Sequence, residues 1–161
     1  MVPERIKPYF KITHQKDDGE NSLVEGVLTC CNDYAFKVFG VGEVKHSIFH
    51  GTYLLPENDI IVLEAHCQKC GKSITIFDNG CDGYDCYEKR EQTQVSTKPL
   101  NCNKCQDNSY LISIKYEYPD EQELEMLEIE EADNAFTWIW VTLECNKCRA
   151  KYKNFIDYET A

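Results

Sequence analysis

The sequence has few basic residues and no long hydrophobic run. Its 161 residues hold 17 lysines and arginines against 28 aspartates and glutamates, which gives a formal net charge of −11. A protein that binds a nucleic-acid backbone needs a basic surface to release counterions, so nucleic acid is not expected as a partner. No stretch approaches the roughly 18 apolar residues of a membrane span. The 42% of hydrophobic residues and 28% of charged residues are typical of a folded globular chain.

Motifs of the common enzyme classes are also absent. The sequence has no G-x-S-x-G, no phosphate-binding loop and no dinucleotide fingerprint. His46 and His50 are four residues apart but lack the intervening glutamate of a metalloprotease motif. The N-terminal residues MVPERIKPYFKITHQ lack the apolar core of a secretory signal. The sequence therefore predicts a cytoplasmic protein that is not an enzyme.

Cysteine, in contrast, is abundant, with ten residues in the chain. Six of them form three C-x-x-C pairs: Cys67–Cys70, Cys102–Cys105 and Cys145–Cys148. This spacing lets two thiolates and the backbone between them cover one face of a tetrahedral zinc ion, and two such pairs close a four-sulfur site. A redox dithiol would open a helix in a βαβ unit, and no such unit is visible. We expect two structural zinc ions, in sites without an open position for chemistry.

The two halves of the chain resemble each other. When Cys31 is aligned with Cys105, an aspartate two residues later and an aromatic residue five residues later coincide. When Cys67 is aligned with Cys145, each pair follows an apolar run and precedes a phenylalanine by seven residues. The separations, 36 residues in one copy and 40 in the other, are similar. The pattern predicts two tandem copies of one zinc module.

The first copy departs from the pattern at its first ligands. The position that matches Cys102 is Leu28, and Cys30 stands beside Cys31 instead. Adjacent cysteines can both reach one metal only with a distorted backbone. The predicted ligands of the first site are Cys30, Cys31, Cys67 and Cys70, with His66 as the alternative to Cys30. The predicted ligands of the second site are Cys102, Cys105, Cys145 and Cys148.

Runs of β-branched and aromatic residues flank the cysteine pairs, at residues 23–28, 36–39 and 110–116. Cysteine pairs in turns that join or end β-strands resemble the zinc-ribbon superfamily, over the eight matched cysteines and their flanking strands. The resemblance implies a small β fold held by zinc and implies no single function. We expect a mainly β protein with a first zinc-ribbon-like module at residues 1–86, a linker at 87–99 and a second module at 100–161.

Residues 117–133 carry most of the negative charge. The segment contains nine acidic residues and no basic one, and without those nine the formal net charge would be −2. Asp120 follows a proline and predicts the start of a short helix, with Leu124, Leu127 and Ala132 as a thin apolar stripe. The segment is either a solvated excursion or a docking surface for a basic protein partner. The predicted contact residues are Glu121, Glu123, Glu125 and Glu128.

Cys81 and Cys86 lie outside the repeat and could form a third metal half-site, a disulfide or two separate thiols. Lysines beside the second cysteine of each pair are expected to offset thiolate charge. Together these features predict a zinc-stabilised protein-binding module with an acidic surface, such as an inhibitor, antitoxin or immunity protein for a basic, nucleic-acid-handling partner. The alternative is an accessory protein of transcription or translation that contacts nucleic acid through a small basic face.

Overall fold

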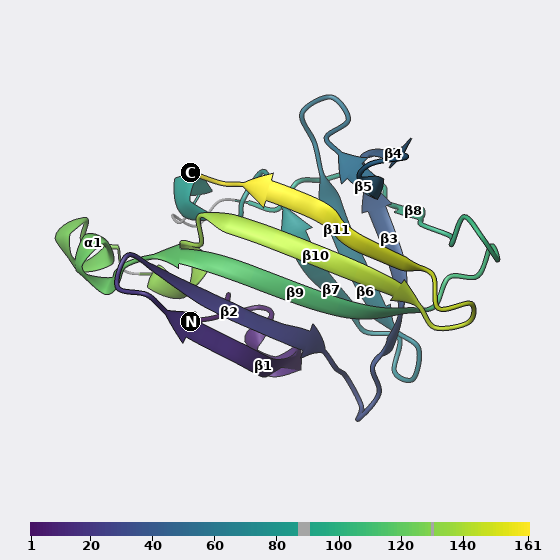
Figure 1. Ribbon diagram of the computed structural model, residues 1–161, viewed down its shortest axis with the longest axis horizontal. Coiled ribbons are helices and arrows are strands. Elements are labelled where there is room, and N and C mark those ends of the chain that lie inside the picture. The colour runs from purple at the N-terminus through teal and green to yellow at the C-terminus, as the bar shows by residue number, and fades with distance from the viewer. Residues whose placement is uncertain (87–90, 130) are drawn as a thin grey trace.

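The computed structural model describes residues 1–86, 91–129 and 131–161, and in this part of the chain β-strands dominate (Figure 1). The strands are β1 (Phe10–Asp17), β2 (Asn21–Leu28), β3 (Ala35–Val41), β4 (Glu43–Ser47), β5 (Gly51–Leu55), β6 (Val62–Cys67), β7 (Ser73–Asp78), β8 (Lys98–Pro99), β9 (Tyr110–Pro119), β10 (Trp138–Cys145) and β11 (Lys151–Glu159). The helices are α1 (Glu121–Met126) and the 3₁₀ turns η1 (Lys7–Tyr9), η2 (Tyr84–Cys86) and η3 (Ala132–Asn134). The predicted mainly β class, with a short helix inserted in the second module, is confirmed.

Strand β9 lies at the centre of one curled sheet of nine strands (Figure 1). Along one edge β9 pairs with β10, and along the other it pairs with β2 over residues 113–119 and with β3 over residues 110–111. Beyond these neighbours, β11 pairs with β10, β1 with β2, and β6 and β7 continue from β3. The hairpin β4–β5 forms a separate two-stranded sheet and packs against β11.

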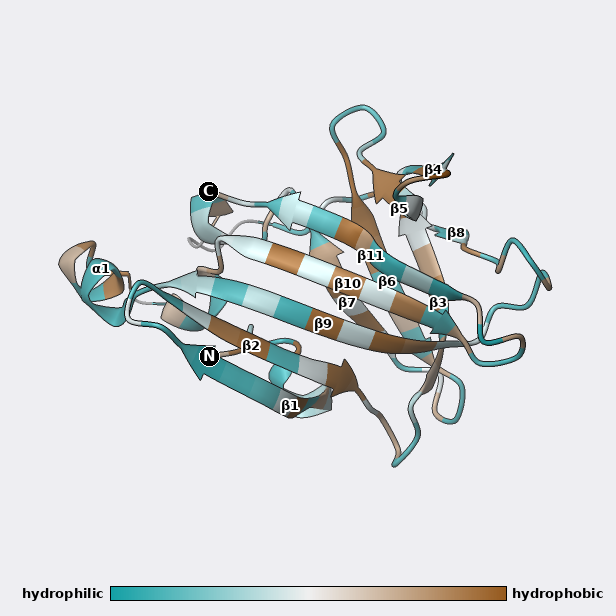
Figure 2. Cartoon of the chain, in the orientation of Figure 1, coloured by the Kyte–Doolittle hydropathy of each residue, from teal (hydrophilic) through white to brown (hydrophobic). Residues whose placement is uncertain are grey.

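The sheet forms because its strands alternate apolar and polar residues, as the bands along β10 show (Figure 2). In β9, Ile112 and Ile114 are buried, whereas Ser113 and Lys115 point to the other face and are only half-buried. In Figure 1, β6 and β7 lie behind β9 and β10. The apolar side chains therefore face the inside of the curl, and the polar ones form an open outer face.

Each four-cysteine module contains three antiparallel strands, β3–β6–β7 in the first and β9–β10–β11 in the second. Phe36 pairs with Cys67 in the first module, and Tyr110 pairs with Cys145 in the second. These are the aromatic residues and the cysteines that the sequence alignment of the two halves brings together. The same register in both modules is what two copies of one unit would have.

The two modules share their core as well as their sheet. Phe77 of the first module contacts Phe136 and Tyr158 of the second, with ring centroids 6.4 and 5.2 Å apart. The predicted linker at 87–99 lies partly outside the described residues, which omit 87–90, and its end forms β8, which pairs with β3 of the first module. The two modules therefore pack against each other in the structure.

Candidate metal centres

The structure brings eight of the ten cysteines into two clusters of four. In the first centre, the Sγ atoms of Cys30, Cys31, Cys67 and Cys70 all lie within 4.8 Å of one another. Cys30 Sγ is 3.8 Å from Cys31 Sγ and 3.7 Å from Cys70 Sγ. The ligands come from the turn before β3 and from the turn that joins β6 to β7.

The second centre has the same construction one module later. The Sγ atoms of Cys102, Cys105, Cys145 and Cys148 lie within 4.8 Å of one another. Cys102 Sγ is 3.6 Å from Cys148 Sγ, and Cys105 Sγ is 3.5 Å from Cys145 Sγ. These ligands come from the turn before β9 and from the turn that joins β10 to β11.

The sulfur spacing fits a tetrahedral metal ion in both centres. Sulfurs bound to zinc at about 2.3 Å are about 3.8 Å apart at the corners of a tetrahedron. Four of the Sγ–Sγ separations, at 3.5 to 3.8 Å, match this value, and all four lie far from the bonding distance of about 2.05 Å in a disulfide. Each cluster can therefore bind one metal ion through four sulfurs, which leaves no open position for substrate or water.

The three C-x-x-C turns have one common backbone conformation. In each, the N–H of the first cysteine donates to the carbonyl five residues later, and its own carbonyl accepts from the N–H four residues later, at 2.8 to 2.9 Å. The residue after the second cysteine has a positive φ in all three turns: Gly71 (74°), Gln106 (64°) and Arg149 (63°). This repeated turn aims both thiols of a pair at the same point.

The Cys30–Cys31 turn is tighter than the other three. Cys30 and Asp33 exchange both backbone hydrogen bonds, at 3.0 and 2.9 Å, so only two residues form the loop. Those two, Cys31 and Asn32, have φ of 54° and 56°. A left-handed conformation is unfavourable for a residue with a Cβ atom, by roughly 1–2 kcal/mol. This is the backbone distortion that adjacent ligands were expected to need.

The thiols of the second centre differ in acidity. Burial tends to raise the pKa of Cys102, but hydrogen bonds from the Tyr152 hydroxyl and from two backbone N–H groups outweigh it and lower the pKa to about 6. The backbone N–H of Asp107 tends to lower the pKa of Cys105, but burial and the neighbouring thiols raise it to about 12. The Cys102 thiolate therefore forms easily, whereas the Cys105 thiol resists ionisation unless a cation is present.

The first centre shows the same contrast. Hydrogen bonds from backbone N–H groups, chiefly that of Cys70, lower the pKa of Cys67 to about 7 against the effect of burial. Burial and the neighbouring thiols raise the pKa of Cys30 to about 12. In both clusters one thiol has a lowered pKa and another a raised pKa. A bound metal ion would supply the positive charge that permits all four thiols to ionise.

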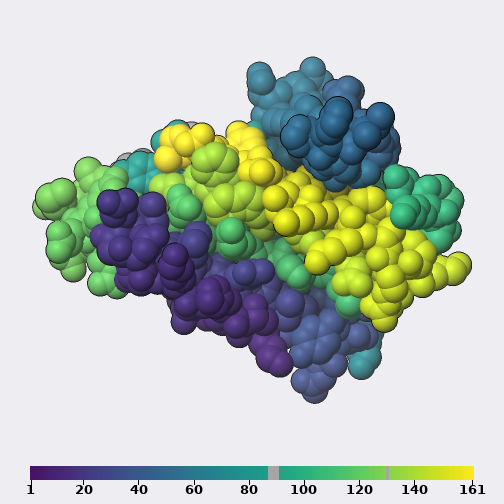
Figure 3. Space-filling model, viewed as in Figure 1, coloured from purple at the N-terminus to yellow at the C-terminus, as the bar shows by residue number. Residues whose placement is uncertain are grey.

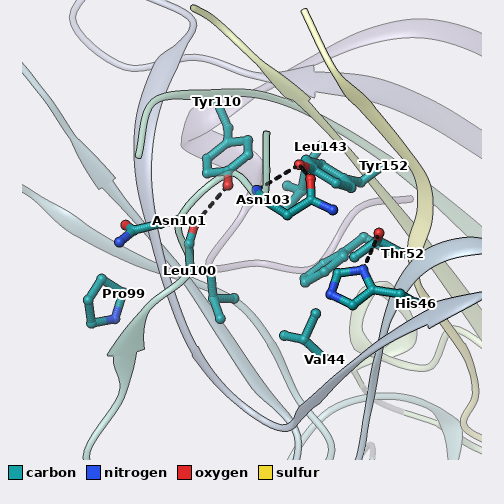
Figure 4. Close-up of a pocket in the computed structure, with 11 residues that line it drawn as sticks. Val44, His46, Thr52, Pro99, Leu100, Asn101, Asn103, Tyr110, Leu143 and Tyr152 are labelled. Carbon is teal, nitrogen blue, oxygen red and sulfur yellow. Dashed lines mark hydrogen bonds between the residues drawn. The ribbon is translucent and has the colours of Figure 1, made fainter. Parts of the chain in front are cut away.

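A hollow of about 250 Å³ lies beside the second centre, and Tyr152 is one of the residues that line it (Figure 4). The Tyr152 hydroxyl lies 3.1 Å from Cys102 Sγ and also contacts the Asn103 side chain. Across the hollow, His46 Nδ1 lies 2.9 Å from Thr52 Oγ1 on the hairpin β4–β5. Such hydrogen bonds to a ligand sulfur orient it and tune its charge, so Tyr152 supports the second centre.

Other candidate ligands lie elsewhere. His66 is outside both clusters, with its ring stacked on Phe39 at 4.3 Å and its Nε2 3.4 Å from Glu64. Of the described residues, Cys81 and Cys86 belong to no group of three or more potential metal ligands. The expectation that His66 could replace Cys30 is therefore not supported by the geometry.

The Cys81 loop has a structural contact that the sequence did not reveal. The Asp82 carboxylate accepts hydrogen bonds from both terminal nitrogens of Arg5. The Arg5 Nε donates to the Thr75 carbonyl at 2.8 Å. Burial raises the pKa of Asp82, although Arg5 acts in the opposite direction. Burial and the adjacent carboxylates raise the pKa of the Cys81 thiol to about 12, so this thiol stays neutral. The loop fastens the N-terminal segment to β7.

The cations beside the cysteine pairs are exposed and dispersed. Lys72 Nζ lies 5.1 Å from the Tyr9 ring centroid, and Arg149 lies 3.9 Å from Glu144. The remaining three, Lys69, Lys104 and Lys147, are exposed. Each is close enough in sequence to a cluster to offset thiolate charge.

The acidic segment lies at one end of the molecule, where α1 projects from the sheet (Figure 1). Asp120 caps the helix by accepting the N–H of Glu123 at 2.7 Å. Leu124 is buried as predicted, but Leu127 is 51% exposed, and Ile129 is buried in its place. The apolar stripe was wrong at Leu127 because the helix ends at Met126 and Glu128 has a φ of 52°. Glu130 lies outside the described residues.

The fold and the two clusters define a β protein with two four-cysteine centres on a shared sheet. In comparisons with known proteins, no protein-family model, no curated protein and no solved structure matches the chain. No helix in the described part of the chain is long and apolar enough to cross a membrane.

Proposed function

We propose that this protein is a zinc-stabilised protein-binding module. Zinc is the metal that four thiolates in closed tetrahedral sites most commonly hold in proteins. Each structural zinc would supply on the order of 10 kcal/mol of folding free energy, which is comparable with the stability of a typical domain. The two ions would hold the sheet and leave its surfaces for recognition.

The observation that carries the binding proposal is the acidic end, which we define as residues 120–128. Two large apolar side chains are exposed there, Met126 at 79% and Leu127 at 51%. Glu121, Glu125 and Glu128 surround them in sequence, are exposed, and form no ion pair with any described residue. Apolar side chains that are rimmed by charges of one sign are typical of protein interfaces.

The charge of this surface indicates a basic partner. Asp133 pairs with Lys7 at 2.6 Å, whereas Glu123 contacts the Tyr84 hydroxyl at 3.3 Å but stays exposed, so it can join Glu121, Glu125 and Glu128 in docking. A cluster of carboxylates speeds the encounter with a basic protein and disfavours acidic ones. We propose an inhibitor, antitoxin or immunity protein that masks a basic, nucleic-acid-handling partner.

Charge-matched variants test this proposal. The partner is first isolated by co-purification from the native host, and its association rate is measured at two salt concentrations. The test variant carries Glu→Gln at residues 121, 123, 125 and 128. The control carries the same number of Glu→Gln changes at exposed residues elsewhere, namely 20, 57, 91 and 159. Both variants lie outside the metal centres and change the net charge equally.

The test variant should bind about 10-fold more slowly at low salt, and its rate should depend less on salt than that of the parent. The control should behave nearly as the parent does, because its changes are spread over the surface. Equal rates for the two variants would mean that the acidic end is not the docking surface.

A further inference from the structure

The only two tryptophans of the chain, Trp138 and Trp140, lie together on the outer face of the sheet. Between and beyond them in β10, Ile139 and Val141 are fully buried on the opposite face. The two indole rings are nearly parallel, with an interplanar angle of 8° and centroids 5.5 Å apart. Partly exposed, parallel aromatic rings on a sheet form a surface on which flat groups can stack.

Lysines surround the second of these rings. Lys115 Nζ lies 4.2 Å from the centroid of the Trp140 ring. A hollow of about 210 Å³ beside Trp140 is lined by Lys115, Lys151 and Lys153, and Glu25 is the acidic residue among the described lining residues. In a chain with a net charge of −11, this hollow is locally positive. It therefore favours an anionic ligand.

The hollow continues toward the hairpin β4–β5. Lys153 and Asn154 also line a second hollow, of about 510 Å³, with His50 and Tyr53 of the hairpin and Asp157 of β11. Figure 3 shows the hairpin, in blue, beside the yellow residues of β11, against which it packs. The two hollows are adjacent because they share Lys153 and Asn154, and Trp140 lines the first while Tyr53 of the hairpin lines the second; together with Trp138 they form one candidate binding surface. We name it the tryptophan groove.

Acidic residues near Trp138 determine in which direction a bound anionic chain would extend. Trp138 lies opposite Glu117 on β9 and opposite Glu159 on β11, and its Nε1 donates to Asp157 at 2.7 Å. Glu117 and Glu159 would repel phosphates at the Trp138 end, whereas the Asp157 carboxylate accepts the hydrogen bond of Trp138. The lysines at the Trp140 end would attract phosphates, so a bound anionic chain would extend from Trp140 toward Lys153.

We propose that the tryptophan groove binds a short single-stranded nucleic acid. Bases stack on Trp140 and Trp138, and the ammonium groups of the three lysines contact phosphates. Single-strand binding surfaces combine these two elements, because every base has a flat face and every linkage has a charge. The Lys115 ammonium, which lies on the Trp140 ring, moves to a phosphate when a base takes its place. A purely electrostatic site would not need the parallel indoles.

This groove shares no residue with the acidic end, which begins after the last residue of β9. The overall negative charge opposes a long polyanion, so we expect binding of a short segment that weakens steeply with salt. Three phosphate contacts correspond to a slope of about −2 in a plot of log affinity against log salt.

Intrinsic fluorescence tests the proposal, because all tryptophan emission comes from this groove. The zinc-loaded full chain is titrated with a twelve-residue oligothymidylate at low salt. Saturable quenching, with the expected salt slope, supports the proposal. Absence of any change up to about 100 µM oligonucleotide overturns it, as does tighter binding of a duplex of the same length.

Two further probes separate base stacking from charge. Dextran sulfate and inorganic phosphate carry negative charge without bases. If either changes the emission as strongly as the oligonucleotide, the groove is an electrostatic anion site and the proposal fails. Weaker effects of both are the expected result.

Matched lysine variants locate the phosphate contacts. The double substitution Lys115→Gln and Lys153→Gln should weaken oligonucleotide binding about 10-fold and reduce the salt slope. The control, Lys37→Gln and Lys98→Gln, removes the same charge from exposed residues outside the groove and should bind as the parent does. Equal losses in both variants would overturn the assignment. Zinc content and circular dichroism show whether each variant is folded, and neither variant alters the acidic end.

Discussion

The four turns that carry the cysteines differ in one instructive respect. Three of them are C-x-x-C turns with the same hydrogen bonds and the same positive φ after the second cysteine. The fourth places Cys30 and Cys31 next to each other in a two-residue loop, with Cys31 itself in the left-handed conformation. Both constructions place their sulfurs within 4.8 Å of one another and of the other two ligands of the centre. A four-sulfur centre therefore constrains the sulfur positions more than it constrains the backbone.

The two centres also differ in exposure and support. Two ligands of the first centre, Cys31 and Cys70, are exposed, compared with only Cys148 in the second centre. Cys102 has the Tyr152 hydroxyl at 3.1 Å, whereas among the described residues the hydrogen-bond partners of the Cys30 and Cys31 thiols are other sulfurs, at 3.7 to 3.8 Å. The second centre should hold its metal more tightly, and the first should exchange more readily.

Removal of metal should have the largest effect. We expect two zinc ions per chain by elemental analysis of protein purified without chelator. A graded chelator titration should remove the ion of the first centre before that of the second, and removal of both should unfold the chain, because each ion supplies on the order of 10 kcal/mol. Zinc release and far-ultraviolet circular dichroism follow the two steps. A content well under one zinc per chain would contradict the predicted zinc sites. Release of the second centre's ion before that of the first would contradict the predicted order of affinity.

Loss of one ligand should have the next largest effect. Cys145→Ser leaves three sulfurs in a buried centre and should lower the melting temperature by about 15 °C or more, since a loss of ~5 kcal/mol corresponds to that shift in a chain of this size. Cys86→Ser, outside both clusters, should lower it by less than about 2 °C. Scanning calorimetry measures both. Similar losses would show that Cys86 is also a ligand or a bridge.

Removal of the supporting hydroxyl should affect one centre only. Tyr152→Phe keeps the ring of the core and removes the group at 3.1 Å from Cys102, so the zinc affinity of the second centre should fall about 10- to 100-fold. Competition with a chromophoric chelator measures the affinity of each centre. Tyr110→Phe, whose hydroxyl donates to the Leu100 carbonyl and not to a sulfur, is the matched control. If both variants lose the same affinity, the effect belongs to the core and not to the ligand.

Relief of backbone strain should have the smallest effect. Asn32 has a φ of 56° in the two-residue loop, and glycine adopts this conformation without steric cost. Asn32→Gly should stabilise the first centre by about 0.5 kcal/mol, because the left-handed strain of roughly 1–2 kcal/mol exceeds the entropy that glycine adds to the unfolded chain. Arg149→Gly makes the same change in a regular turn of the second centre, where φ is 63°. Denaturant titration gives the free energy of unfolding of both variants. A larger stabilisation by Arg149→Gly than by Asn32→Gly would show that the irregular turn is not the more strained one.

The sequence was sufficient for the parts that depend on local spacing. The C-x-x-C pairs and the 36- and 40-residue separations predicted which four sulfurs would meet, and Asp120 predicted the helix start. The prediction that Leu127 belongs to the apolar stripe was wrong because the positive φ at Glu128 ends the helical periodicity. Such a local reversal leaves no signal in the spacing of apolar residues.

Features that depend on distant pairing could not be predicted. Nothing in residues 21–28 indicates that this strand pairs with β9, far along the chain. The tryptophan groove was equally hidden, because Lys115, Trp140 and Lys153 lie on three strands that meet only in the folded sheet. The net charge of the whole chain does not reveal a local cluster of lysines such as this one.

The position of β9 has a consequence for the order of biosynthesis. The first centre is complete once Cys70 has left the ribosome, so it could take up metal early. Strand β2, however, cannot find its partner until residues 113–119 have also emerged. During that interval the edge of β2 that later pairs with β9 remains open, and open strand edges are prone to aggregation. Early zinc uptake would limit the freedom of the unfinished chain while it waits for β9.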